Sequence, residues 1–143
     1  MFRIMIKRKI ILVLSVILFS MLNLKCDDDN PVICEYIACT MEYRTVSVSL
    51  KHIADNTPYQ LSDFKVLRVS DNTDITPPGD SYAALNGYYP VATDSNREMF
   101  RFKNVEVEFY GYLINNLVVQ KRFTITADCC HISLVEGETT IHL

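Results

Sequence analysis

The chain has 143 residues, of which 49% are hydrophobic and 22% are charged. This apolar content excludes a disordered protein, and the length is enough for one domain but not for two separate cores. The four glycines are too few and too scattered to build a glycine-rich phosphate-binding loop.

Charge is distributed unevenly along the chain. Residues 1–25 contain five of the 14 basic residues and none of the 17 acidic ones, so residues 26–143 carry a net charge of −8. A domain this acidic lacks the basic surface that attracts nucleic acids or anionic lipids. We therefore expect no nucleic-acid partner, and we expect membrane association only through an attached lipid.

The first 25 residues are typical of a secretory signal peptide. Basic residues at positions 3, 7, 8 and 9 precede an apolar run over residues 10–22, which only Ser15 and Ser20 interrupt. A helix of that length spans about 20 Å, which is short of the ~30 Å hydrocarbon core of a bilayer. An uncleaved N-terminal anchor is the alternative interpretation.

Cys26 follows the apolar run and opens the segment CDDDN. In these residues the chain resembles a bacterial lipoprotein of the Bacteroidota, whose lipidated cysteine becomes the first residue of the mature protein. The resemblance implies lipidation of Cys26, and the acidic run after it implies display at the surface of the outer membrane. Lys25 departs from the small residue that is usual before such a cysteine. A periplasmic or secreted protein is the alternative.

The acidic run also predicts the domain organisation. Three adjacent carboxylates at positions 27–29 repel one another and stay hydrated, which favours an extended chain. We therefore expect a signal helix over residues 1–25, an acidic tether over residues 26–38 and one folded domain over residues 39–143.

Four further cysteines occur as two pairs, Cys34 with Cys39 and Cys129 with Cys130. An even number of cysteines in an exported protein predicts disulfides. Neighbouring residues of a strand point to opposite faces, so Cys129 and Cys130 are poorly placed to bond each other. Each is therefore expected to bond a cysteine of the other pair, and both pairings of this kind remain open.

The same four cysteines and His131 are also zinc ligands by residue type. The C-x4-C spacing is loose for a zinc knuckle, and adjacent cysteines on an extended strand do not chelate one ion easily. Disulfides without a bound metal or cofactor are therefore the main prediction, and a zinc-binding envelope protein is the alternative. A nucleophilic pair of Cys130 and His131 is not favoured, because the two side chains would face opposite sides of a strand.

Short segments of alternating hydrophobicity predict β-strands after the tether. In residues 44–53, for example, Val46, Val48 and Leu50 share one face. The predicted strands cover residues 44–53, 63–70, 88–93, 105–112, 117–126, 130–134 and 139–143. About seven short strands separated by turns predict an all-β fold, an antiparallel two-sheet sandwich.

Local signals place several features within this sandwich. Asn115-Asn116 predicts a hairpin between two strands, and Asn86-Gly87 is the strongest turn signal in the chain. Pro90 predicts an edge position for the strand at residues 88–93. Residues 81–85 are compatible with one helical turn.

A second resemblance rests on the strings NGYYPV, VEVEFYGYLINN and ADCCHISLVEG. They are similar to a group of uncharacterised Bacteroidota lipoproteins that end in a comparable ADCCH segment. The order of strands and turns is more distantly similar to carboxypeptidase regulatory-like domains, which are transthyretin-like sandwiches. The more distant resemblance implies a transthyretin-like sandwich, for which an Ig-like sandwich is the near equivalent, and neither resemblance brings catalytic residues.

Glu106 and Glu108 are candidates for acid–base chemistry. They lie two residues apart on a predicted strand, so about 7 Å separates them, which is a carboxylate spacing that glycosidases use. A solvated outer face of the sheet is the favoured interpretation, and a small envelope hydrolase is the alternative.

Tyr82, Tyr88 and Tyr89 are candidate binding residues, because tyrosine offers contact area and a hydroxyl at little entropic cost. Packing inside the sandwich is the competing interpretation. Together these observations predict a lipid-anchored envelope protein that is not an enzyme and that acts as a binding or structural module, with a glycan, a peptide or an envelope protein as the expected class of partner.

Overall fold

The computed structural model describes residues 34–143, which form one compact unit. The predicted signal helix, the lipidation candidate Cys26 and the first part of the acidic tether lie outside these residues. Within the described part, no helix has the length and apolar character needed to cross a bilayer.

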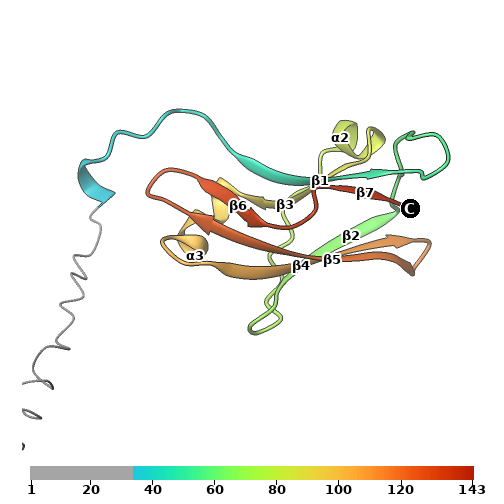
Figure 1. The fold of residues 1–143 in the computed structure, drawn as a ribbon. Helices are drawn as coiled ribbons and strands as arrows, with labels where there is room; N and C mark the ends of the chain where they lie inside the picture. Colours follow the sequence, from blue (N-terminus) through green and yellow to red (C-terminus); the bar gives the residue numbers. More distant parts are fainter. Residues whose placement is uncertain (1–33) are drawn as a thin grey trace, which may run out of the picture. The chain divides into compact units, whose positions relative to one another are not determined.

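Seven strands form two sheets (Figure 1), which confirms the predicted strand number and the two-sheet arrangement. The three-stranded sheet has the order β3-β1-β7, and the four-stranded sheet has the order β2-β4-β5-β6. The strands are β1 (Thr45–Lys51), β2 (Asp63–Arg68), β3 (Tyr88–Thr93), β4 (Val105–Leu113), β5 (Asn116–Ala127), β6 (Ile132–Glu136) and β7 (Thr140–His142).

One strand pair corrects the expectation of a wholly antiparallel sandwich. β7 runs parallel to β1, with Ser49 opposite Thr140 and Lys51 opposite His142. The chain leaves β6 in the four-stranded sheet, turns at Gly137 and enters the other sheet beside β1 in the same direction. Alternating hydrophobicity looks the same in both directions, so the sequence pattern carries no sign of this pairing.

The β4–β5 hairpin forms where the asparagine pair predicts it. Its tip places Ile114 and Asn115 at positive φ, 50° and 66°, which is typical of the two central residues of a type I′ turn. The Ser62 hydroxyl oxygen accepts a hydrogen bond of 2.8 Å from the Ile114 N–H and therefore holds the turn from outside.

The turn predicted at Asn86-Gly87 is confirmed, and it connects a short helix to β3. The short helix α2 (Ser81–Leu85) begins after Asp80, whose side chain accepts a hydrogen bond from the Tyr82 N–H. Gly87 follows at φ +73°, and a Cβ there would lie 2.5 Å from the Leu50 carbonyl oxygen. Only glycine fits this close approach, which delivers the chain into β3. β3 is an edge strand, as Pro90 predicts.

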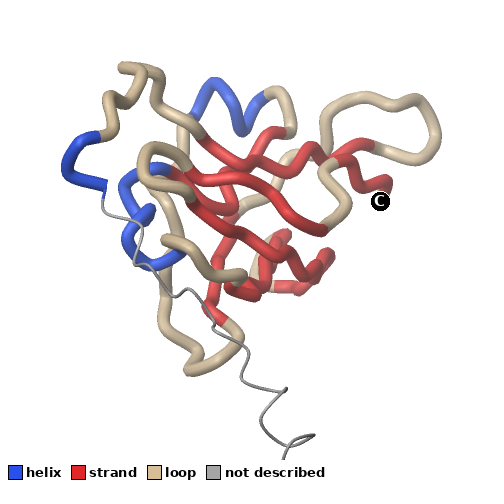
Figure 2. The backbone as a smooth tube through the Cα atoms, turned by 60° about the vertical axis from the view of Figure 1, so that its left-hand side comes forward, coloured by secondary structure: helices blue, strands red, loops and turns tan. Residues whose placement is uncertain are grey.

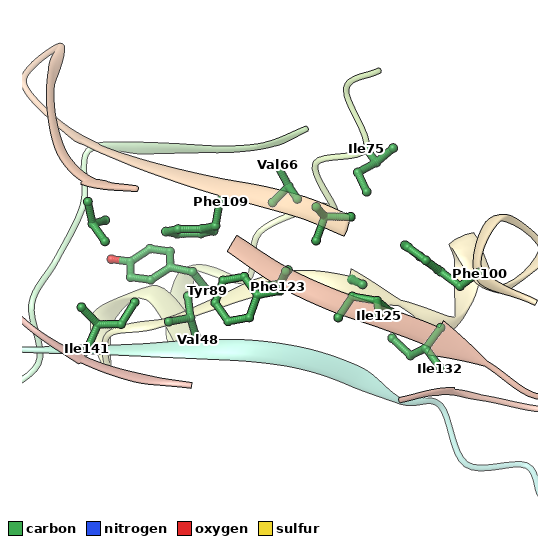
Figure 3. Packing of buried hydrophobic residues seen from close by; sticks show 14 of the residues in the cluster. Val48, Val66, Ile75, Tyr89, Phe100, Phe109, Phe123, Ile125, Ile132 and Ile141 are labelled. Atoms are coloured by element: carbon green, nitrogen blue, oxygen red, sulfur yellow. The ribbon is translucent and has the colours of Figure 1, made fainter. Parts of the chain in front are cut away.

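The two sheets bury one shared hydrophobic core. Val48, Tyr89 and Ile141 come from the three-stranded sheet and face Phe109 and Phe123 of the other sheet (Figure 3). The rings of Tyr89 and Phe109 lie 6.3 Å apart at their centroids and are tilted by 49°. Aromatic residues from both sheets therefore fill the centre of the sandwich.

The remaining helical segments are short and lie at the margin of the sheets (Figure 2). They are the 3-10 helices η2 (Cys34–Tyr36) and η3 (Asp94–Asn96) and the helix α3 (Arg97–Phe100). η2, α3 and the turn between β5 and β6 lie at one end of the molecule, and the β4–β5 hairpin lies at the opposite end with the C-terminus (Figure 1). We call the first of these the clamp end.

Candidate functional site

All four described cysteines form disulfides at the clamp end. Cys34 bonds Cys129, and Cys39 bonds Cys130. The prediction that each cysteine bonds one of the other pair is therefore confirmed, and one of the two open pairings is selected. Both bonds fix the N-terminal segment to the turn between β5 and β6.

The disulfides also remove the basis of the zinc alternative. Zinc binds the thiolate form of cysteine, and a sulfur in a disulfide has no proton to lose and no thiolate to offer. Among residues 34–143 no group of three or more metal-ligating side chains is close enough to hold an ion.

A buried histidine forms a third link between the N-terminal segment and the sandwich. The His131 Nδ1 lies 2.8 Å from a carboxylate oxygen of Asp94, and its Nε2 lies 2.8 Å from the Thr40 hydroxyl. Because the carboxylate is an acceptor only, Nδ1 carries the proton, and in the neutral ring Nε2 accepts from the Thr40 hydroxyl. The imidazole therefore bridges residues that are 54 positions apart, Thr40 and Asp94.

Asp94 joins three segments at the clamp end. Besides His131, it accepts hydrogen bonds of 2.8 Å from the N–H groups of Arg44 and Ile132, which lead into β1 and begin β6. Burial raises the pKa of the Asp94 carboxyl, but these N–H and imidazole donors together outweigh burial and hold the pKa below its ordinary value. The carboxylate is therefore the charged centre that ties the two sheets together.

Asp128 shapes the turn that carries both cysteine partners. Its carboxylate accepts from the N–H groups of Cys130 at 2.6 Å and His131 at 2.8 Å. The hydrogen bonds from these two N–H groups, that of His131 first, lower the pKa of Asp128. Arg97 of α3 donates to the Cys130 carbonyl at 3.1 Å, so the turn is held from both sides.

The order hydroxyl, imidazole, carboxylate is also the order of a nucleophilic triad. A triad needs further N–H donors that stabilise the oxyanion of the intermediate. The N–H groups of Cys130 and His131, which lie next to the ring, are both used by Asp128. What the contacts show is that Thr40 satisfies a buried ring nitrogen of His131, as a structural hydrogen bond does.

Comparison with known proteins gives no relatives for this arrangement. No protein-family model, curated protein or solved structure matches the chain.

Glu106 and Glu108 lie on the four-stranded sheet and are not brought together in one cavity. Both approach Arg122 across the β4–β5 pair, at 3.5 Å and 3.8 Å. The Tyr110 hydroxyl donates to Glu108 at 2.6 Å and is the main cause of the lowered pKa of that carboxyl. A general acid for glycoside cleavage needs the opposite shift, so these contacts favour an ordinary ion-paired sheet surface.

The three candidate tyrosines occupy different environments. Tyr82 on α2 is 75% exposed and Tyr88 at the start of β3 is 49% exposed. Tyr89 is a core residue instead, and its hydroxyl accepts a hydrogen bond of 2.7 Å from the Leu61 N–H. Tyr88 and Tyr89 differ in exposure because successive residues of β3 face opposite sides of the sheet.

Sequence reasoning missed Thr40 and Asp94. Neither belongs to a motif, and 54 residues separate them in the chain. The Cys-Cys-His string marked one partner of the tie, but the carboxylate that orients the imidazole becomes visible only in three dimensions.

Proposed function

We propose that this chain is an exported, lipid-anchored envelope protein whose sandwich is a non-catalytic binding module. Its lipid would be carried by Cys26, and the tether would lead from that residue to the clamp end. From the resemblance of its first residues to Bacteroidota lipoproteins we infer that it is displayed at the surface of the outer membrane. Its two-sheet arrangement is consistent with an Ig-like or transthyretin-like module.

The pair of disulfides is the observation that carries this proposal. Disulfides persist in oxidising compartments outside the cytoplasm and are rare inside it. The first cysteine of each bond lies near the beginning of the described residues. Cys34 and Cys39 follow Cys26 by eight and thirteen residues. A domain attached at this end needs its first residues held firmly, because any pull on the tether is passed to that segment.

The bonds at the clamp end would resist such a pull. Cys34 and Cys39 transfer force to the β5–β6 turn through covalent bonds, and Thr40 adds a hydrogen bond to buried His131. We propose that the partner binds on the opposite end of the sandwich or on an outer sheet face, away from the disulfides. The partner is a glycan, a peptide or another envelope protein, and no nucleic acid is expected.

Expression of the full chain in a Bacteroidota host tests the anchoring. The chain should incorporate labelled fatty acid and sediment with the outer membrane, and protease added to whole cells should degrade it. Cys26→Ala should abolish the labelling and release the protein from the membrane. Cys130→Ser is the matched control and should keep the label. A wild-type chain that carries no lipid would overturn the proposal.

A further inference from the structure

A hydroxyl-rich groove lies on the three-stranded sheet and is bordered by Leu134 of β6. Its volume is about 500 Å³, and it is shallow and widely open to solvent. The side chains that matter for its chemistry are those of Ser47, Ser49, Lys51, Tyr88, Thr139 and Thr140.

The register explains why these side chains gather there. Ser49 of β1 is opposite Tyr88 of β3 on one side and Thr140 of β7 on the other, so the three form a row across the sheet. Lys51 and Ser47 occupy the next positions on the same face of β1, because side chains alternate along a strand. Val48 and Leu50 point into the core and are fully buried.

The groove differs in charge from the rest of the chain. Within residues 34–143 no carboxylate lines it, although acidic residues outnumber basic ones in the sequence. Lys51 takes part in no ion pair among residues 34–143, and Lys103 is the other described lysine of which this is true. The ammonium group of Lys51 can therefore pair with an anionic group of a ligand.

The backbone of β1 offers further polar groups at the same place. The Ser49 N–H donates to the Thr139 carbonyl at 2.7 Å, whereas the Leu50 N–H donates to Gly87 on the other side. By this alternation the main chain of Ser47 faces the side of β7, and the pairing of β7 covers only Ser49 to Lys51. The polar groups of Ser47 consequently border the groove.

The part of β1 that β7 leaves unpaired is a poor template for the addition of a peptide strand. It is only a few residues long, and a register shift between Val46 and Ser47 interrupts the pairing of β1 with β3 behind it. Short and bulged edges are those that resist strand addition. A ligand recognised by hydroxyls, one cation and an aromatic rim fits these features better than an extended peptide.

We propose that this groove binds an acidic oligosaccharide, which deepens the binding role proposed above and rests on it. The sugar hydroxyls pair with the hydroxyls of Ser47, Thr139 and Thr140, which are more exposed than that of Ser49, and a ring carboxylate pairs with Lys51. The exposed ring of Tyr88 packs against an apolar face of the sugar, with its hydroxyl kept at the solvent side. Charge complementarity with Lys51 selects the acidic sugar over a neutral one.

Calorimetric and NMR titration of the oxidised chain 26–143, with an unlipidated Cys26→Ser start, tests this inference. The probes are tetragalacturonate, a heparin tetrasaccharide and a sialylated trisaccharide, with maltotetraose and tetraglutamate as comparisons. At least one acidic sugar should bind and shift the amide signals of Ser47, Ser49 and Lys51. Lys51→Gln should weaken that binding about tenfold, as expected for the loss of one ion pair to a ligand. Lys103→Gln is the matched control and should leave binding unchanged.

The possible failures can be told apart. If none of the acidic sugars shifts the groove signals, or if Lys103→Gln weakens binding as much as Lys51→Gln, the inference is overturned. If tetraglutamate binds at the groove as well as the best sugar does, the ligand is a peptide and the inference is also wrong. The anchoring proposal stands or falls separately, on the lipid at Cys26.

Discussion

At the scale of single residues, Asp94 connects several segments of the chain, although no sequence motif indicates this role. Its side chain is about nine-tenths buried, and it accepts from Arg44, His131 and Ile132 at once. A buried carboxylate with three donors is stable only while it stays charged. We therefore expect the clamp end to be sensitive to acid.

Asp94→Asn should lower the free energy of unfolding at pH 7 by about 3 kcal/mol, because an amide nitrogen then faces a backbone donor. Urea unfolding monitored by far-ultraviolet circular dichroism measures this. Asp63→Asn is the control: that carboxylate is exposed and bonds only the next N–H, so a change below about 0.5 kcal/mol is expected.

The pH dependence of the same pair of proteins has a defined sign. The pKa of Asp94 is lowered in the folded state, so its contribution is fully present above the unfolded value of about 3.9. It is lost as the pH falls through the lowered folded pKa. The stability gap between wild type and Asp94→Asn should therefore persist at pH 5 and shrink below about pH 4. A gap that is constant down to pH 2 would contradict this account.

Substitutions of Thr40 test whether its hydroxyl is a structural hydrogen-bond partner or a catalytic nucleophile. Thr40→Val leaves the Nε2 of His131 without its partner and should cost about 1 kcal/mol in unfolding free energy. Neither protein should hydrolyse p-nitrophenyl acetate faster than free imidazole at the same concentration. Hydrolysis that disappears in Thr40→Val and survives in Thr40→Ser would show that the hydroxyl is a nucleophile.

At the scale of elements, most of the strands follow from sequence, and the exceptions have physical causes. The hairpin at Asn115-Asn116, the edge position of β3 and the helical turn at Ser81–Leu85 all reflect local chemistry that single residues impose. The direction of β7 depends instead on where a distant strand ends. Local periodicity does not record that information.

The tip of the β4–β5 hairpin gives an element-scale prediction. Ile114 is 77% exposed at φ 50°, a backbone region in which a β-branched side chain is disfavoured. Ile114→Asn should therefore raise the free energy of unfolding by about 1 kcal/mol, because asparagine tolerates this conformation. Thermal unfolding by calorimetry measures the gain.

Ile53→Asn is the matched control for the hairpin. Ile53 is 71% exposed but is not among the described residues with positive φ. Its replacement should change stability by less than about 0.5 kcal/mol. Equal gains in both variants would attribute the effect to lost surface hydrophobicity and not to the backbone.

At the scale of the whole molecule, the two disulfides act as one clamp. They join the same two short segments, with sequence separations of 95 and 91 residues. Once either bond has closed the long loop, the second closes only a small ring, so its entropic effect is smaller. The free energies of the two bonds are therefore strongly non-additive.

This coupling predicts a specific pattern of stability losses. Cys39→Ser with Cys130→Ser should cost about 2.5 kcal/mol, the loop-closure value for a ring of about eight residues. Replacing all four cysteines by serine should cost a further 4 to 5 kcal/mol, roughly the value for a ring of about a hundred residues. Urea unfolding of the three proteins measures both steps. Equal losses at the two steps would contradict the single-clamp description.

The sequence predicts that the two cysteine pairs are joined by disulfides, but not which cysteine bonds which. Cysteine number and adjacency disfavour a bond between Cys129 and Cys130, whereas the choice between the two remaining pairings depends on how the turn is held. Asp128 accepts from the N–H groups of Cys130 and His131 and so holds the turn that carries both cysteines. Such side-chain geometry is not encoded in spacing.

The most direct test of the account is the intact mass of the mature protein, purified from the envelope of its own cell without reductant. The account predicts a chain that begins at Cys26, carries an added lipid and lacks two hydrogens for each of two disulfides. Reduction should restore four hydrogens, and digestion should yield peptides linking Cys34 to Cys129 and Cys39 to Cys130. An unprocessed chain with four free thiols would contradict the account.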